Sequence, residues 1–162
     1  MIAFIDKAMR IQIFDIERNK TVPVDKQLFH YQGALSSFSA SWSPDSRWLA
    51  YARDLKTRGS AIFLFDTKEE KAAQVTSGYY QDSGPVFDPD GKYLYFLTGR
   101  TFTPTYSDVD NTWIYPNTTN VAAATLSDEV PSPLAPRNDS TGVKKEEPKK
   151  DEAKKLKLTL SG

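Results

Sequence analysis

Apolar and polar residues alternate in short runs along most of this chain, and turn-forming sequences separate the runs. Residues 48–53 and 93–97 are rich in aromatic and aliphatic side chains. A Pro-Asp pair precedes each run, and in such pairs proline sets φ while the next residues accept a tight turn. No stretch keeps a 3.6-residue apolar period over the length of a helix. The pattern therefore predicts short antiparallel strands joined by tight turns.

The strand pattern repeats along the chain. SWSPDSRWLAY, which begins at Ser41, aligns without a gap with the later segment PVFDPDGKYLYF, and Pro89 lies 45 positions after Pro44. A second pair, IQIFDIERNKTVPV from Ile11 and IFLFDTKEEKAAQVT from Ile62, shares an apolar strand ending in Phe-Asp, a charged turn and a further strand. Four short strands in a period of about 40 to 45 residues are typical of a propeller blade.

These repeats predict an all-β fold with two to three four-stranded blades of a β-propeller, an incomplete ring, followed by a charged linker. The third blade is irregular, because a proline-rich excursion separates its second strand from a later strand around residues 121–126. The charged segment has almost no apolar residues with which to build a core. The predicted units are a partial blade at 1–35, a full blade at 36–80, the irregular blade at 81–136, the flexible linker at 137–156 and the start of a further strand at 157–162.

Three runs carry a resemblance to a known family. SSFSASWSPDSRWLAYARD, QVTSGYYQDSGPVFDPDGKYLYFLTGR and NVAAATLSDEVPSPLAPRNDS together resemble the propeller region of tricorn-type serine proteases, over nearly the whole chain. Single Pro-Asp-Gly turns occur in many propellers, whereas the proline-rich third blade followed by a Lys/Glu linker is the stronger discriminator. The resemblance implies a large multidomain serine peptidase in which propellers precede a catalytic region with a PDZ-like module and control the passage of peptides.

The resemblance implies that this chain is a non-catalytic propeller segment that contributes to substrate access or gating in a parent hydrolase. Its implied partners are peptide substrates and the catalytic domains of the parent chain, within an oligomer. The alternative is a TolB-like propeller that acts as a protein-binding scaffold without proteolysis. The sequence downstream of Gly162 discriminates the two, since a PDZ-like module and a serine-protease core support the first.

Composition narrows the classes of partner. The formal net charge is zero, so no global field draws the chain to nucleic acid or to an acidic membrane surface. There is no cysteine, which excludes disulfides, thiolate nucleophiles and cysteine-ligated zinc. The opening MIAFIDKAMRIQIFDIE does not resemble a signal peptide, and no run approaches the about 20 apolar residues that cross a bilayer. We expect a cytoplasmic protein, or a periplasmic one if a longer parent carries an upstream signal.

No catalytic, cofactor-binding or metal-ligating residue is predicted, and no cofactor. His30 is the only histidine, and no G-x-S-x-G elbow occurs. A catalytic triad is defined by the geometry of its residues and not by the presence of the three residue types, so His30 is interpreted as a structural or surface residue. Asp88, Asp90 and Gly91 resemble the start of an EF-hand loop, but the later ligands are missing and a hairpin turn is the better interpretation.

Three further features have both a functional and a structural interpretation. Residues 144–157 hold seven lysines against four acidic residues, a mixture typical of a solvated tether. Asn117-Thr118-Thr119 and Asn138-Asp139-Ser140 fit the glycosylation sequon, which without a secretory signal is attributed to chance. A set of aromatic residues could stack on single-stranded nucleic acid, but alternation within strands favours sheet packing. This set is Tyr79, Tyr80, Phe87, Tyr93, Tyr95 and Phe96.

Overall fold

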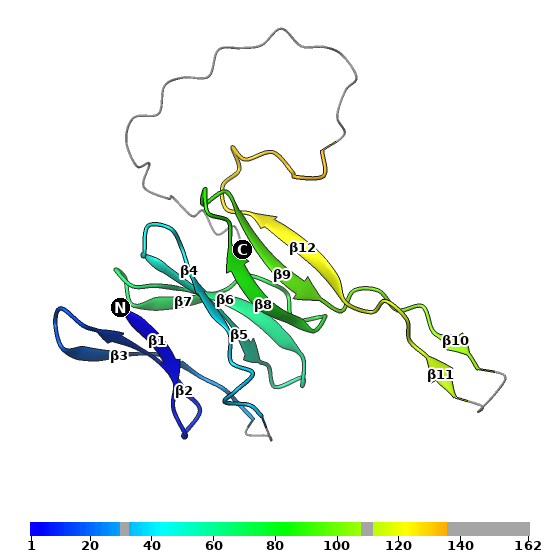
Figure 1. Cartoon of the computed structure of the whole chain (residues 1–162), viewed down its shortest axis with the longest axis horizontal. Helices are drawn as coiled ribbons and strands as arrows, with labels where there is room; N and C mark the ends of the chain where they lie inside the picture. The colour runs from blue at the N-terminus through cyan, green and yellow to red at the C-terminus, as the bar shows by residue number, and fades with distance from the viewer. Residues whose placement is uncertain (30–32, 108–111, 136–162) are drawn as a thin grey trace, which may run out of the picture.

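The protein is described by a computed structural model, which covers residues 1–29, 33–107 and 112–135. Within these residues all regular structure is β, and every strand pair within a sheet is antiparallel, which confirms the predicted all-β propeller fold. Three sheets stack face to face, and a small hairpin projects from the third (Figure 1). None of the described residues forms a helix long and apolar enough to span a membrane.

The strands follow the chain from one sheet to the next. The first sheet contains β1 (Ile2–Ile5), β2 (Arg10–Asp15) and β3 (Lys20–Lys26). The second, in the order β4-β5-β6-β7, contains β4 (Ala40–Trp42), β5 (Trp48–Asp54), β6 (Ser60–Asp66) and β7 (Lys71–Gln74). The third, in the order β12-β9-β8, contains β8 (Asp82–Phe87), β9 (Tyr93–Thr98) and β12 (Asn120–Thr125). The hairpin pairs β10 (Thr105–Tyr106) with β11 (Trp113–Ile114).

The two predicted Pro-Asp turns have the same geometry. The Ser43 N–H donates to the Trp48 carbonyl, and the Asp88 N–H, 45 positions later, donates to the Tyr93 carbonyl, both at 2.9 Å. In each turn the third residue after that donor has positive φ, 57° at Ser46 and 68° at Gly91. Glycine adopts this left-handed conformation without steric cost, so Pro89-Asp90-Gly91 is the better adapted of the two turns. The prediction that residues 36–97 form two successive antiparallel sheets, each with a matching Pro-Asp turn between its first two strands, is confirmed.

The middle sheet is buried on both faces, which explains the nearly continuous apolar runs of β5 and β6. One face packs against the third sheet, through Trp48, Ala50, Ile62 and Leu64 on one side and Phe87, Leu94, Phe96 and Leu126 on the other. The opposite face packs against Ile11 and Ile13 of the first sheet, through Leu49, Tyr51, Ala61, Phe63 and Phe65. Alternate residues of the same strands therefore belong to two different cores.

The two outer sheets each keep one apolar face exposed. On the first sheet Ile2 and Phe4 are exposed, while Ala3 and Ile5 face the middle sheet. On the third sheet Leu97 and Val121 are exposed directly opposite each other in the ladder. Because Leu97 occupies the position of Ala52, which lies against the third sheet, this exposed face corresponds to the one through which one sheet packs on the next.

The third sheet contains the predicted excursion. Between β9 and β12 the chain forms the β10-β11 hairpin and then returns, so that β12 pairs along the whole of β9. The later strand predicted around residues 121–126 is therefore found at β12. The blade boundaries at 35/36 and 80/81 remain predictions, and the linker at 137–156 and the strand at 157–162 lie outside the described residues.

An ion pair ties the start of β5 to the end of β6. The Arg47 guanidinium donates from Nε to Oδ1 of Asp66 at 3.1 Å and also contacts Oδ2, and the Asp66 side chain is only 6% exposed. Backbone N–H groups of Lys68 and Glu69 also donate to Asp66. The hydrogen bond from Arg47, helped by these backbone donors, holds the pKa of Asp66 below its usual value.

This pair predicts acid sensitivity. A carboxyl whose pKa is lowered by folding stabilises the native state above its unfolded pKa, and this contribution is lost as the pH falls through the folded pKa. The free energy of unfolding should therefore fall on acidification below about pH 4. Arg47→Leu should flatten that dependence, as measured by urea unfolding at a series of pH values in dilute protein. Equal slopes for the two proteins would contradict the assignment.

Candidate functional site

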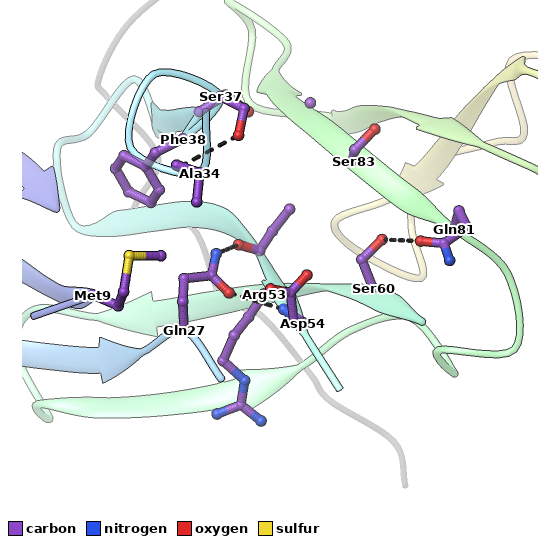
Figure 2. Close-up of a pocket in the computed structure, with 13 residues that line it drawn as sticks. Met9, Gln27, Ala34, Ser37, Phe38, Arg53, Asp54, Ser60, Gln81 and Ser83 are labelled. Atoms are coloured by element: carbon purple, nitrogen blue, oxygen red, sulfur yellow. Dashed lines mark hydrogen bonds between the residues drawn. The ribbon is translucent and has the colours of Figure 1, made fainter. Parts of the chain in front are cut away.

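A cavity of about 460 Å³ lies where the first strands of the second and third sheets begin. Its walls come from all three sheets and from the segment that leads into β4, and Figure 2 shows polar side chains around it. Strands β4 and β8, the first strands of the second and third sheets, contact each other. The Phe87 N–H of β8 donates to Oγ of Ser41 in β4 at 3.1 Å. The lining residues are Met9, Gln27, Ala34, Ser37, Phe38, Ser39, Ala52, Arg53, Asp54, Ser60, Gln81, Ser83 and Gly84.

Gln27 connects the first sheet to the middle sheet at the floor of the cavity. Its side-chain Nε2 donates to the Ala52 carbonyl, and its Oε1 accepts from the Asp54 N–H, both at 2.9 Å (Figure 2). The Gln27 backbone N–H donates to the Met9 carbonyl. One amide side chain therefore mimics a strand partner for the end of β5, which fixes the position of Asp54. Burial raises the pKa of the Asp54 carboxyl.

Ser60 and Gln81 connect the middle sheet to the third sheet on another wall. The Ser60 hydroxyl lies 3.1 Å from Oε1 of Gln81 (Figure 2). It also lies 2.8 Å from the Asp82 carbonyl oxygen, and Gln81 Nε2 donates to the Arg58 carbonyl at 3.2 Å. An amide oxygen and a carbonyl oxygen can accept this hydroxyl hydrogen, but neither is a base that would activate Ser60 as a nucleophile. The contact positions two sheets and does not resemble a catalytic pair.

An ion pair between the first and middle sheets lies next to the cavity. The Asp25 carboxylate of β3 accepts from the Tyr51 hydroxyl at 2.9 Å and from an Arg53 guanidinium nitrogen at 2.8 Å. The guanidinium carbon of Arg53 lies 4.2 Å from the centre of the Phe63 ring, a cation–π contact, and Phe63 stacks on Tyr51. Burial, with Asp25 nearby, raises the pKa of Tyr51, so this phenol stays protonated and remains a donor.

The cavity offers hydroxyl, amide and carboxyl groups beside a few apolar side chains. Ser83 and Gly84 carry little side-chain bulk on one wall, and Ser37 and Ser39 face the cavity from the loop before β4. Such groups can hydrogen-bond to the N–H and C=O groups of an extended peptide regardless of its sequence. The geometry therefore suits transient contact with a polypeptide better than chemistry on it.

The residues singled out in the sequence do not converge on this cavity. His30 lies outside the described residues, as do Asn138 and residues 144–157. Asp88, Asp90 and Gly91 form the turn between β8 and β9, where the Lys92 N–H donates to Asp88, so the hairpin interpretation is confirmed. Asn117 is exposed on the excursion.

The aromatic set is divided among different environments. Phe87 and Phe96 are buried in the core between the second and third sheets. Tyr93 and Tyr95 form a ring pair on the outer face of the third sheet, and Tyr79 is 89% exposed in the loop before β8. These side chains do not form one platform, which supports the interpretation as sheet packing for the strand residues.

Sequence reasoning did not identify the cavity residues. Ser60 and Ser83 stand at strand starts with no motif around them, and Gln27 looks like any surface polar residue. The available signal was weak: Gly59-Ser60 and Ser83-Gly84 place small residues at the starts of β6 and β8. Their proximity depends on the stacking of the sheets, which the repeat predicted only in outline.

Comparison with known proteins agrees with the fold. The protein-family model described as the tricorn protease second beta propeller domain matches residues 1–162. The putative tricorn-like protease C-terminal subunit of Sulfurisphaera tokodaii is 41% identical over 68 residues, which is 42% of this chain and 8% of that protein. The tricorn protease homolog of Saccharolobus solfataricus is 30% identical over 101 residues, 62% of this chain and 9% of that protein.

A solved structure of the tricorn protease aligns with a TM-score of 0.69 at 22% identity, over 90% of this chain and 15% of that chain, and so supports the propeller fold. The chain spans less than a tenth of the length of the curated relatives described above. The family match also favours the tricorn interpretation over the TolB-like one. The repeat, the stacked sheets and the family match over the whole length show that the chain belongs to the tricorn protease second beta propeller domain family.

Proposed function

We propose that this chain is a non-catalytic part of a propeller through which peptides reach or leave the active site of a tricorn-type serine protease. The observation that carries the proposal is the cavity at the starts of β4 and β8. First strands of successive blades line the axis of a propeller, so this cavity would open on the central channel. Its partners would be peptide substrates and the catalytic domains of an oligomeric parent protein.

The chemistry of the cavity fits passage better than tight binding. Peptides of many sequences share only their backbone groups, and the hydroxyl and amide groups of Ser37, Ser83 and Gln81 can contact these groups without selecting a side chain. The small residues Ser83 and Gly84 leave space on the wall formed by β8. Weak, sequence-independent contacts allow a chain to enter and also to leave.

A bulky residue in the cavity tests the proposal in the full-length protein. Ser83→Trp should slow the hydrolysis of a long unstructured peptide several-fold and leave the hydrolysis of a short fluorogenic peptide nearly unchanged, because only the long chain must thread past the indole. Lys71→Trp, on the exposed edge strand β7, is the control and should change neither rate. Equal rates for wild type and Ser83→Trp on both substrates would refute the role in access.

A further inference from the structure

One strand connection of the third sheet is much longer than the corresponding connections of the other two sheets. Residues 6–9 connect β1 to β2 and residues 55–59 connect β5 to β6, whereas residues 99–119 connect β9 to β12. This longer connection contains the β10-β11 hairpin, which extends away from the three stacked sheets (Figure 1). We call its described residues, 101–107 and 112–119, the aromatic ribbon. It is an addition to the blade pattern.

Large apolar side chains cover the aromatic ribbon and remain in contact with solvent. Their exposed fractions are 73% for Phe102, 49% for Tyr106, 57% for Trp113, 51% for Ile114 and 51% for Tyr115. Phe102 contacts Tyr115 with ring centroids 5.7 Å apart, and Tyr106 contacts Trp113 edge to face at 5.5 Å. The aromatic side chains therefore form two exposed ring pairs on one short segment, and a concentration of exposed apolar side chains marks interaction sites on soluble proteins.

The aromatic ribbon contains no basic residue. Its described residues include no Asp, Glu, Lys or Arg, and threonine, asparagine, serine and proline fill the positions between the apolar side chains. The sequence between residues 107 and 112 adds two carboxylates, Asp108 and Asp110. A segment without basic residues has no attraction for phosphate groups, which argues against nucleic acid. Tyrosine and tryptophan with few charges are instead enriched where one protein surface is buried on another.

The hairpin has little internal support. Its ladder pairs Thr105 with Ile114 and Tyr106 with Trp113, and the Ser107 N–H donates to the Thr112 carbonyl at 2.9 Å. The described ribbon residues add ring contacts, and the hairpin is a sheet of two strands. A two-stranded hairpin by itself is at best marginally stable in water. Burial of its aromatic side chains on a partner would supply the missing stabilisation.

The lengths of the related proteins indicate where that partner lies. This chain accounts for 8% and 9% of two curated relatives and for 15% of the tricorn protease chain, so most of those polypeptides lies elsewhere. A domain joined to the same polypeptide has a high effective concentration and needs no separate encounter. The base of the ribbon is fixed to the cavity rim, where the Gly99 N–H donates to the Gln81 carbonyl at 3.0 Å.

We propose that the aromatic ribbon docks into an apolar pocket on another domain of the same polypeptide, outside these residues. Trp113, Tyr115 and Phe102 are the anchors, and the pocket presents backbone or hydroxyl acceptors to the indole N–H and the phenol. The ribbon then holds the rim of the propeller, at Gly99 and Gln81, in a set position relative to that domain. This contact is independent of whether peptides pass through the cavity.

Photo-cross-linking in the full-length protein tests the docking. With p-benzoylphenylalanine at position 102 or 113, irradiation should join the ribbon to residues of the same polypeptide outside residues 1–162, and at position 134 it should not. Mixing isotopically labelled and unlabelled protein separates intramolecular products from intersubunit ones. Products that join two copies, products with added peptide alone, or a gene that encodes no further domain would each overturn the proposal.

A double variant supplies a second measurement. Trp113→Ala with Tyr115→Ala should lower the melting temperature of the full-length protein or split one calorimetric transition into two, because the propeller and its neighbour lose a shared interface. Leu134→Ala, which truncates a side chain that is 90% exposed, is the matched control and should leave the transition unchanged. An unchanged transition in the double variant would show that the ribbon is not docked.

Discussion

The 162-residue chain, expressed by itself, is expected to be poorly folded or to self-associate through the outer faces of its first and third sheets. Each outer sheet buries one face on the middle sheet, and its other face exposes side chains such as Phe4, Leu97 and Val121. Burying a large apolar side chain contributes roughly 1.5 to 3 kcal/mol. Several such side chains together are comparable with the about 5 to 15 kcal/mol that stabilises a domain.

Sedimentation velocity and scanning calorimetry check this expectation. The double variant Leu97→Lys with Val121→Lys places two charges on the outer face of the third sheet and should shift the chain towards monomer, whereas Leu134→Lys should leave self-association unchanged. Neighbouring blades added to the chain should restore a single sharp unfolding transition. A monomeric wild-type chain with one sharp transition would contradict the expectation and would favour an autonomous binding module.

Alanine substitutions at two adjacent core residues should each disrupt a different interface of the middle sheet. Leu64 is 1% exposed and faces the third sheet, whereas Phe65 is 2% exposed and faces the first. Leu64→Ala should cost about 2 to 5 kcal/mol of unfolding free energy, and Phe65→Ala about 3 to 5 kcal/mol. Both losses are a large part of the stability of a domain.

Hydrogen exchange distinguishes the two losses. Because the interfaces are separate, Leu64→Ala should raise exchange mainly in β8 and β9, and Phe65→Ala mainly in β2 and β3. Val86→Ala, at a residue 56% exposed on β8, is the control and should change exchange little. The same exchange pattern in both core variants would show that the three sheets unfold as one unit, against the two-core description.

The repeat allowed much of the architecture to be predicted. The Pro-Asp turns at residues 44–45 and 89–90, the strands that follow them and the excursion before β12 all occur where the pattern placed them. Turn chemistry and strand alternation are local properties, so they can be identified along the chain. The candidate site could not be predicted in this way, since Gln27, Ser60 and Ser83 meet only after three sheets have stacked.

By itself, the sequence determined the all-β class, the four-strand period, the turn geometry and the family resemblance, because each depends on residues close together in the chain. The tertiary structure alone decided which alternate side chains of β5 and β6 belong to which core, that polar residues from three sheets surround one cavity, and that the proline-rich excursion presents exposed aromatic side chains on a hairpin. These features depend on contacts between distant segments, and burial of apolar surface, which is non-directional, leaves no local signature of its partner.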